Sequence, residues 1–172
     1  MARSQSLKNP VDYLKTRVIQ GGHSGEHGTY IIGPNVVIDP NQNSHLDTYD
    51  DARDFFRTLI DKDELFAQMV AILATEEIAR AYYHVYEYFG VQGVSFHIVK
   101  DANKLHLLVF LPEVEVEEFE ADVELLSHIT LTLAKVARCE VGSLRVTIGV
   151  ATLSWEKMEQ ENLLYTFERE SN

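Results

Sequence analysis

A run of five apolar residues, from Leu107 to Leu111, constrains the fold of this chain more than any other feature of its sequence. A strand with one face in water alternates apolar and polar side chains, and this run does not alternate. We therefore expect a strand that needs cover on both faces. Residues 94–99 and 105–110 flank a polar turn at residues 100–104, so the run belongs to a predicted hairpin.

Apolar periodicity and turn residues predict the remaining elements. Strands are expected at residues 29–32, 36–38 and 144–153. Helices are expected at residues 11–19, 49–60, 65–89, 116–137 and, as a short helix or turn, 155–159. Gly33-Pro34-Asn35 would join the first two strands through a hairpin or a sharp bend. This order predicts an α+β fold with a mixed or antiparallel sheet packed by helices.

The longest of these predicted helices, over residues 65–89, carries an aromatic cluster from Tyr82 to Phe89. Aromatic rings of this kind could stack on nucleic-acid bases. At helical spacing, however, we expect them to form core and interface contacts.

The length and charge of the chain bound its organisation and its partners. With 172 residues we expect a flexible arm over residues 1–9 and a single domain over residues 10–172. The net charge of −12 disfavours nucleic acid as a partner, because phosphodiester backbones are bound by Lys and Arg. The cations near the start are expected to belong to a solvated arm: Arg3, Lys8, Lys15 and Arg17.

The sequence also indicates the compartment. No apolar stretch approaches the roughly 20 residues of a membrane-spanning helix, and no apolar run follows the first charges, so we expect neither a membrane partner nor a signal peptide. The single cysteine, Cys139, excludes a disulfide framework and favours the reducing cytoplasm. This thiol lies beside Arg138 at a predicted helix end, where we expect an inert packing residue.

Residues capable of chemistry do not form a recognised motif. His23 and His27 lie in a glycine-rich stretch with no Gly-Lys-Ser/Thr ending, which favours a flexible loop over a metal site or a phosphate loop. Seven carboxylates crowd residues 113–124, where a solvated helix N-terminus is favoured over a metal or acid–base site. Among them, Asp122 borders the buried stripe of its helix. We expect no catalytic residue, metal or cofactor.

The second half of the chain resembles the thymidylate synthase and deoxycytidylate hydroxymethylase family in the order and spacing of its motifs. These motifs are the strand pair at 96–99 and 104–110, the helix start at 121–126, the helix end and glycine turn at 134–144, and the run 147–160. Residues 13–33 resemble the family's opening helix, loop and first strand more weakly. The resemblance implies a thymidylate-synthase-like fold and a homodimer joined through the sheet.

The resemblance does not extend to the family's chemistry. The family's nucleophilic cysteine would fall within residues 91–94, which contain no thiol. Its phosphate-binding Arg-Ser falls at Pro112-Glu113, and its sugar-binding His and Tyr become Thr152 and Ser154. Asp122 stands in the place of the base-reading Asn or Asp. The resemblance thus implies a vestigial nucleotide pocket formed by Asp122, Thr152, Ser154 and Glu113.

We therefore expect a pseudoenzyme, a non-catalytic relative of this fold that acts as a binding or regulatory protein through protein–protein contacts. Nucleotide binding would be weak or absent. One alternative is a pyrimidine-nucleotide binding or modifying enzyme that acts on dUMP or dCMP. Another is a single-stranded nucleic-acid binder that uses the aromatic cluster and the basic arm.

Overall fold

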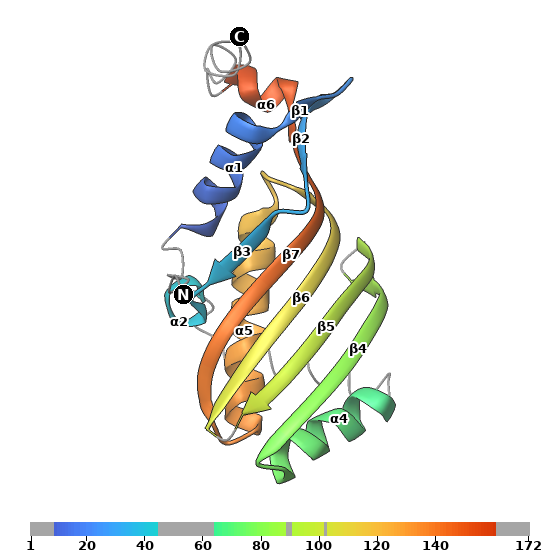
Figure 1. Ribbon diagram of the computed structural model, residues 1–172, viewed down its shortest axis with the longest axis vertical. Helices are drawn as coiled ribbons and strands as arrows, with labels where there is room; N and C mark the ends of the chain where they lie inside the picture. The colour runs from blue at the N-terminus through green and yellow to red at the C-terminus, as the bar shows by residue number, and fades with distance from the viewer. Residues whose placement is uncertain (1–8, 45–63, 89–90, 102, 161–172) are drawn as a thin grey trace.

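A seven-stranded mixed sheet organises the computed structural model, which describes residues 9–44, 64–88, 91–101 and 103–160 (Figure 1). Its strands are β1 (His23–Ser24), β2 (Gly28–Ile32), β3 (Asn35–Ile38), β4 (Ile78–Tyr88), β5 (Val91–Asp101), β6 (Lys104–Glu115) and β7 (Glu140–Ser154). Their order is β1-β2-β7-β6-β5-β4, and β3 also pairs with β7. Within the described ranges β6 and β7 are parallel and the other pairings are antiparallel. The expected α+β class with a mixed sheet is confirmed.

The described helices pack against this sheet and against one another. They are α1 (Pro10–Gly21), α2 (Pro40–Asn43), α4 (Glu64–Thr75), α5 (Phe119–Val136) and α6 (Trp155–Gln160). In Figure 1, α5 lies behind β6 and β7, which it contacts; α4 contacts β4 and α5, and α1 contacts β2, β3 and β7. Lys15 and Arg17, expected in a solvated arm, lie within α1. None of these helices is long and apolar enough to cross a membrane.

The main core lies between α5 and the sheet. The buried side chains of β6 are Leu105, Leu107, Val109, Leu111 and Val114. Between them, Leu108 and Phe110 point the other way and are 38% and 41% exposed. Burial therefore alternates along a run whose residue types do not alternate. In the part of the chain that the structure describes, one face of this strand is covered and the other is not.

The prediction of one long helix over residues 65–89 is wrong. α4 ends at Thr75, and β4 begins at Ile78. β4 pairs with β5 along its whole length, from Ile78, opposite Asp101, to Tyr88. Aromatic side chains suit a half-buried pleated surface, whereas on a helix they lose rotamer freedom against the preceding turn. The aromatic cluster therefore lies largely on a strand, and its outward side chains face the surface of the sheet.

β2 and β3 do not pair with each other, so a sharp bend, and not a hairpin, joins them. Both strands pair with β7 in one continuous register, one after the other. Gly33 lies between them with a φ of 71°, a conformation that favours glycine. The helix expected at residues 49–60 lies outside the described residues.

A buried lysine ties β5 to α4. Lys100 is 6% exposed, and its Nζ donates a hydrogen bond to the carbonyl oxygen of Leu73 at 2.8 Å. That carbonyl belongs to the last turn of α4, where C=O groups have no partner within the helix and the macrodipole favours a cation. Lys100 thus fixes the C-terminal end of α4 to the sheet.

Candidate functional site

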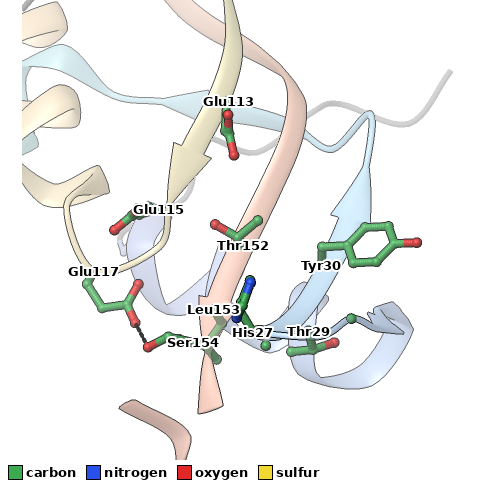
Figure 2. A pocket seen from close by; sticks show the side chains of 11 residues that line it. His27, Thr29, Tyr30, Glu113, Glu115, Glu117, Thr152, Leu153 and Ser154 are labelled. Atoms are coloured by element: carbon green, nitrogen blue, oxygen red, sulfur yellow. Dashed lines mark hydrogen bonds between the residues drawn. The ribbon is translucent and has the colours of Figure 1, made fainter. Parts of the chain in front are cut away.

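An acidic cavity lies beside β2, β6 and β7 (Figure 2). Its volume is about 360 Å³. The described residues that line it are Gly25, His27, Gly28, Thr29, Tyr30, Glu113, Glu115, Glu117, Thr152, Leu153 and Ser154. Three of these are glutamates, and none is lysine or arginine. The carboxylates give the cavity a negative potential that repels anions and attracts cations.

Strand pairing places three of the lining side chains in one row. Thr152 of β7 lies opposite Tyr30 of β2 on one side and opposite Glu115 of β6 on the other. Paired residues in neighbouring strands point to the same face of a sheet, so these three side chains share one surface. Figure 2 shows Thr152 between Tyr30 and Glu115.

A shift in the burial pattern brings Glu113 to the same surface. Along β6 and β7 the buried pair Leu111 and Ile148 is followed by the buried pair Val114 and Ala151, three residues further on. The pairing register of the two strands does not change across this shift. Regular alternation would have buried Glu113, whereas the shift leaves its carboxylate exposed beside the cavity.

Gly149 permits the close approach of the strands at this shift. A Cβ at this position would lie 2.4 Å from the carbonyl oxygen of Pro112, too close for any other residue without backbone movement. On the other side, the Gly33 N–H donates to the Gly149 carbonyl oxygen at 2.9 Å. The bend between β2 and β3 is therefore held at the level of the shift.

Hydrogen bonds orient the polar lining. The Ser154 hydroxyl donates to the Glu117 carboxylate at 3.2 Å, as Figure 2 shows, and the Thr152 hydroxyl donates to the Val114 carbonyl oxygen at 3.4 Å. The indole N–H of Trp155 donates to the Gly25 carbonyl oxygen at 3.3 Å, which holds the glycine-rich loop against the start of α6. The lining thus presents carboxylates and hydroxyls from fixed strands.

The structure brings together three of the four residues expected to form a vestigial nucleotide pocket. Glu113, Thr152 and Ser154 line the acidic cavity, and Asp122 does not. Asp122 lies in the first turn of α5. Burial, and secondarily repulsion from the Glu118 carboxylate, raises the pKa of Asp122 from 3.8 to about 6.

Among the other residues singled out in the sequence, His27 lines the acidic cavity, and His23 and Cys139 do not. His23 lies in β1 and pairs with Tyr30, while the His27 ring is exposed near Glu26. Cys139 is half-buried, and burial raises the pKa of its thiol despite the opposing effect of Lys100. Within the described ranges, no group of three or more His, Cys, Asp or Glu is arranged to hold a metal ion.

Sequence reasoning missed a second candidate surface, the sheet face opposite α5. We call it the open face. It consists of Asn35 and Val37 of β3, Arg80, Tyr82 and His84 of β4, Ser95, His97 and Val99 of β5, His106, Leu108 and Phe110 of β6, and Arg145 and Thr147 of β7. In Figure 1 it faces the viewer, and no described helix covers β4 to β7 there. The surface was missed because these residues come from five strands and only the register brings them together.

The composition of the open face is the reverse of that of the whole chain. The chain holds 27 acids against 15 Lys and Arg, yet the residues of the open face, which end at Phe110 on β6, include two arginines and no acid. Further along β6 the same side of the sheet carries Glu113 and Glu115, which line the acidic cavity. It also exposes large apolar and aromatic side chains: Tyr82 on β4 is 69% exposed, and Leu108 and Phe110 on β6 are exposed as well. At its lower border the register places Asp101, Lys104 and Glu140 in one row.

Side-chain contacts order part of this face. The Tyr82 hydroxyl donates to the Ser95 hydroxyl at 3.0 Å, and Ser95 Oγ lies 2.9 Å from Nδ1 of His84. The rings of Tyr82 and His97 meet edge to face, with centroids 6.4 Å apart. The open face therefore presents a connected group of rings on β4 and β5.

Comparison with known proteins gives no relative from which to transfer a function. No protein-family model matches the chain, and no curated protein matches it.

Proposed function

We propose that this chain is a non-catalytic binding protein that forms a homodimer through the open face of its sheet. The proposal includes the relationship to the thymidylate synthase fold and a cytoplasmic location, which the motif order and the single cysteine support. In this view the protein acts through protein–protein contacts. The acidic cavity is then the remnant of a nucleotide pocket.

The observation that carries the proposal is the composition of the open face. The buried centres of protein interfaces are depleted in Asp and Glu and enriched in aromatic residues and Arg. The open face has this composition within a strongly acidic chain. It also leaves Leu108 and Phe110 exposed on β6, with Tyr82 exposed two strands away on β4. Exposed apolar side chains grouped on one face mark interaction sites in folded proteins.

The lining of the acidic cavity favours a binding protein over an enzyme that modifies nucleotides. A nucleotide phosphate needs cations, and the described lining offers three glutamates with neither lysine nor arginine. Covalent attack on a pyrimidine ring needs an activated nucleophile, and Cys139, whose thiol pKa is raised, is not among the lining residues.

Sedimentation velocity on the purified chain tests the proposal. We expect the wild-type chain at micromolar concentration to have twice the 19.6 kDa mass of one chain. Phe110→Glu places a carboxylate on a central strand of the open face, β6, and is expected to give a monomer, because a buried unpaired charge is costly. The matched control is Ile32→Glu, because Ile32 is 68% exposed and lies outside the open face.

Two outcomes would overturn the proposal. One is a wild-type chain that remains a monomer at micromolar concentration. The other is a dimer that Phe110→Glu and Ile32→Glu affect equally. Circular dichroism on each variant establishes that the chain has folded before its mass is interpreted.

Single-stranded nucleic acid is the second candidate partner for the same face. Tyr82 and Phe110 expose rings on which bases could stack, and Arg80 and Arg145 flank them in the plane of the sheet. A nucleic-acid complex would weaken steeply with salt, because phosphate contacts release counterions. Fluorescence anisotropy with a labelled oligonucleotide, measured from low to physiological salt, separates this candidate from the dimer.

A further inference from the structure

Three of the seven histidines of the chain lie on the open face, one on each of three adjacent strands. They are His84 on β4, His97 on β5 and His106 on β6. His97 lies directly between Tyr82 and Leu108, and His84 lies one row further along, opposite Ser95. His84 and His97 are therefore diagonal neighbours on one surface.

The charged groups within the open face are cations, and acids lie at its borders, with Glu113 beyond Phe110 on β6. β4 contributes Arg80 and β7 contributes Arg145, while the open-face residues of β3, β5 and β6 include no Asp, Glu, Lys or Arg. Asp101, Lys104 and Glu140 form the lower border and leave one net negative charge there. Tyr82 is the titratable group in ring contact with His97. A positive charge on a histidine within this face would therefore join the charges of Arg80 and Arg145, with the nearest acids at the borders of the face.

The three histidines differ in their local bonds. Nδ1 of His106 accepts the backbone N–H of Ser143 at 3.0 Å, so this nitrogen cannot take up a proton without losing that bond. His84 faces the Ser95 hydroxyl, which can donate to a neutral ring or accept from a charged one. His97 is exposed on the surface of the sheet. His84 and His97 are therefore the groups on this face that can gain charge with these bonds kept.

We infer that protonation of His84 and His97 dissociates the homodimer, so that the dimer is a neutral-pH species. This inference rests on the proposed function. In a two-fold contact each added charge occurs twice and meets the arginines of both copies. Burial between two sheets also disfavours the charged imidazole. Both effects mean that the dimer binds fewer protons than two monomers, so acid favours the monomer.

The test measures the dimer dissociation constant by sedimentation velocity at about pH 8 and about pH 5.5, a range in which an ordinary imidazole changes charge. Ionic strength is held constant. For the wild-type chain we expect the dissociation constant to rise by about tenfold or more at the lower pH, because like charges across an interface are costly. The double variant His84→Gln with His97→Gln should dimerise at both pH values with a much smaller change.

Two control variants isolate the open face. His27→Gln removes an exposed imidazole away from this face and should keep the full wild-type pH response. Asp122→Asn removes a carboxyl that titrates in the same range and should also keep it. Two results overturn the inference without contradicting the dimer. One is a wild-type dissociation constant that is the same at both pH values. The other is a pH response that persists in the double histidine variant. A wild-type chain that is monomeric at about pH 8 overturns the proposed function instead.

Discussion

At the scale of single residues, Asp122 shows how burial changes the pKa of a carboxyl group that lies outside the acidic cavity. It lies in the first turn of α5, where the helix dipole favours a negative charge. Desolvation nevertheless dominates and raises the pKa of Asp122 to about 6. Because Asp122 does not line the acidic cavity, this shift describes the stability of the fold more than the chemistry of a site.

The raised pKa predicts a pH dependence of stability with a definite sign. Between pH 3.8 and about 6 the folded chain binds more protons at Asp122 than the unfolded chain, so this group's contribution to stability falls as pH rises. Asp122→Asn should therefore stabilise the chain near neutral pH, on the order of 1 kcal/mol after allowance for solvent screening. Urea unfolding at about pH 4 and about pH 7 measures this. A variant that is equally destabilised at both pH values contradicts it.

The glutamates of the cavity predict weak nucleotide binding. Repulsion of a phosphate by Glu113 and Glu115 should keep dUMP, dCMP and dTMP no tighter than millimolar, equivalent to about −4 kcal/mol. Calorimetric titration at low salt measures this, with Asp122→Ala as the companion variant. Micromolar binding that Asp122→Ala leaves unchanged would move the nucleotide-binding alternative ahead of the dimer, because Asp122 lies outside the cavity.

At the scale of elements, the sequence predicted those segments in which one period dominates. Residues 116–137 have a clear helical stripe, and the hairpin that became β5 and β6 has a clear polar turn. In residues 65–89 most positions carry an apolar or aromatic side chain, so a helical period could be fitted to the whole segment. Residues 78–88 form a strand that pairs with β5, the next strand along the chain. The apolar pattern of residues 65–89 taken alone does not show this pairing.

The candidate sites likewise include residues that the sequence predicted and residues that it did not. Glu113, Thr152 and Ser154 were grouped by a resemblance in motif order, and they do line one cavity. Glu115 and Tyr30 were missed. Tyr30 lay in the predicted strand at residues 29–32, whereas Glu115 lay beyond the predicted strand at residues 105–110, because β6 extends to Glu115. The open face was beyond sequence reasoning, because its rows depend on the relative register of five strands.

The contact between β5 and α4 gives an element-scale prediction. Lys100→Met removes the hydrogen bond to the Leu73 carbonyl and leaves that buried oxygen without its charged partner. Relief from burying the ammonium offsets part of the loss, so we expect a net destabilisation of about 1 kcal/mol. Urea unfolding checks this, with the exposed Lys104→Met as a control that should change stability by less than about 0.5 kcal/mol. Equal stability of both variants would show that Lys100 does not hold α4.

At the scale of the whole molecule, the segregation of charge predicts opposite salt effects for the two candidate partners. Two chains of net charge −12 repel each other, and salt screens that repulsion. The homodimer should therefore tighten between about 50 mM and about 300 mM salt, whereas a nucleic-acid complex should weaken. Sedimentation velocity and anisotropy over the same salt series measure the two trends. A dimer that weakens with salt would contradict association driven by the apolar open face.

The shared pairing of β2 and β3 with β7 also has a consequence for the order in which the chain folds. β5, β6, α5 and β7 are consecutive in sequence, so their contacts close short loops. The bond from Thr147 to Asn35 instead spans 112 residues, and closing so long a loop has a higher entropic cost. We expect residues 28–38 to dock last and to open first. In native-state hydrogen exchange, amides of β2 and β3 should then exchange through a local opening, ahead of those in β6, and equal protection of the two groups would refute this order.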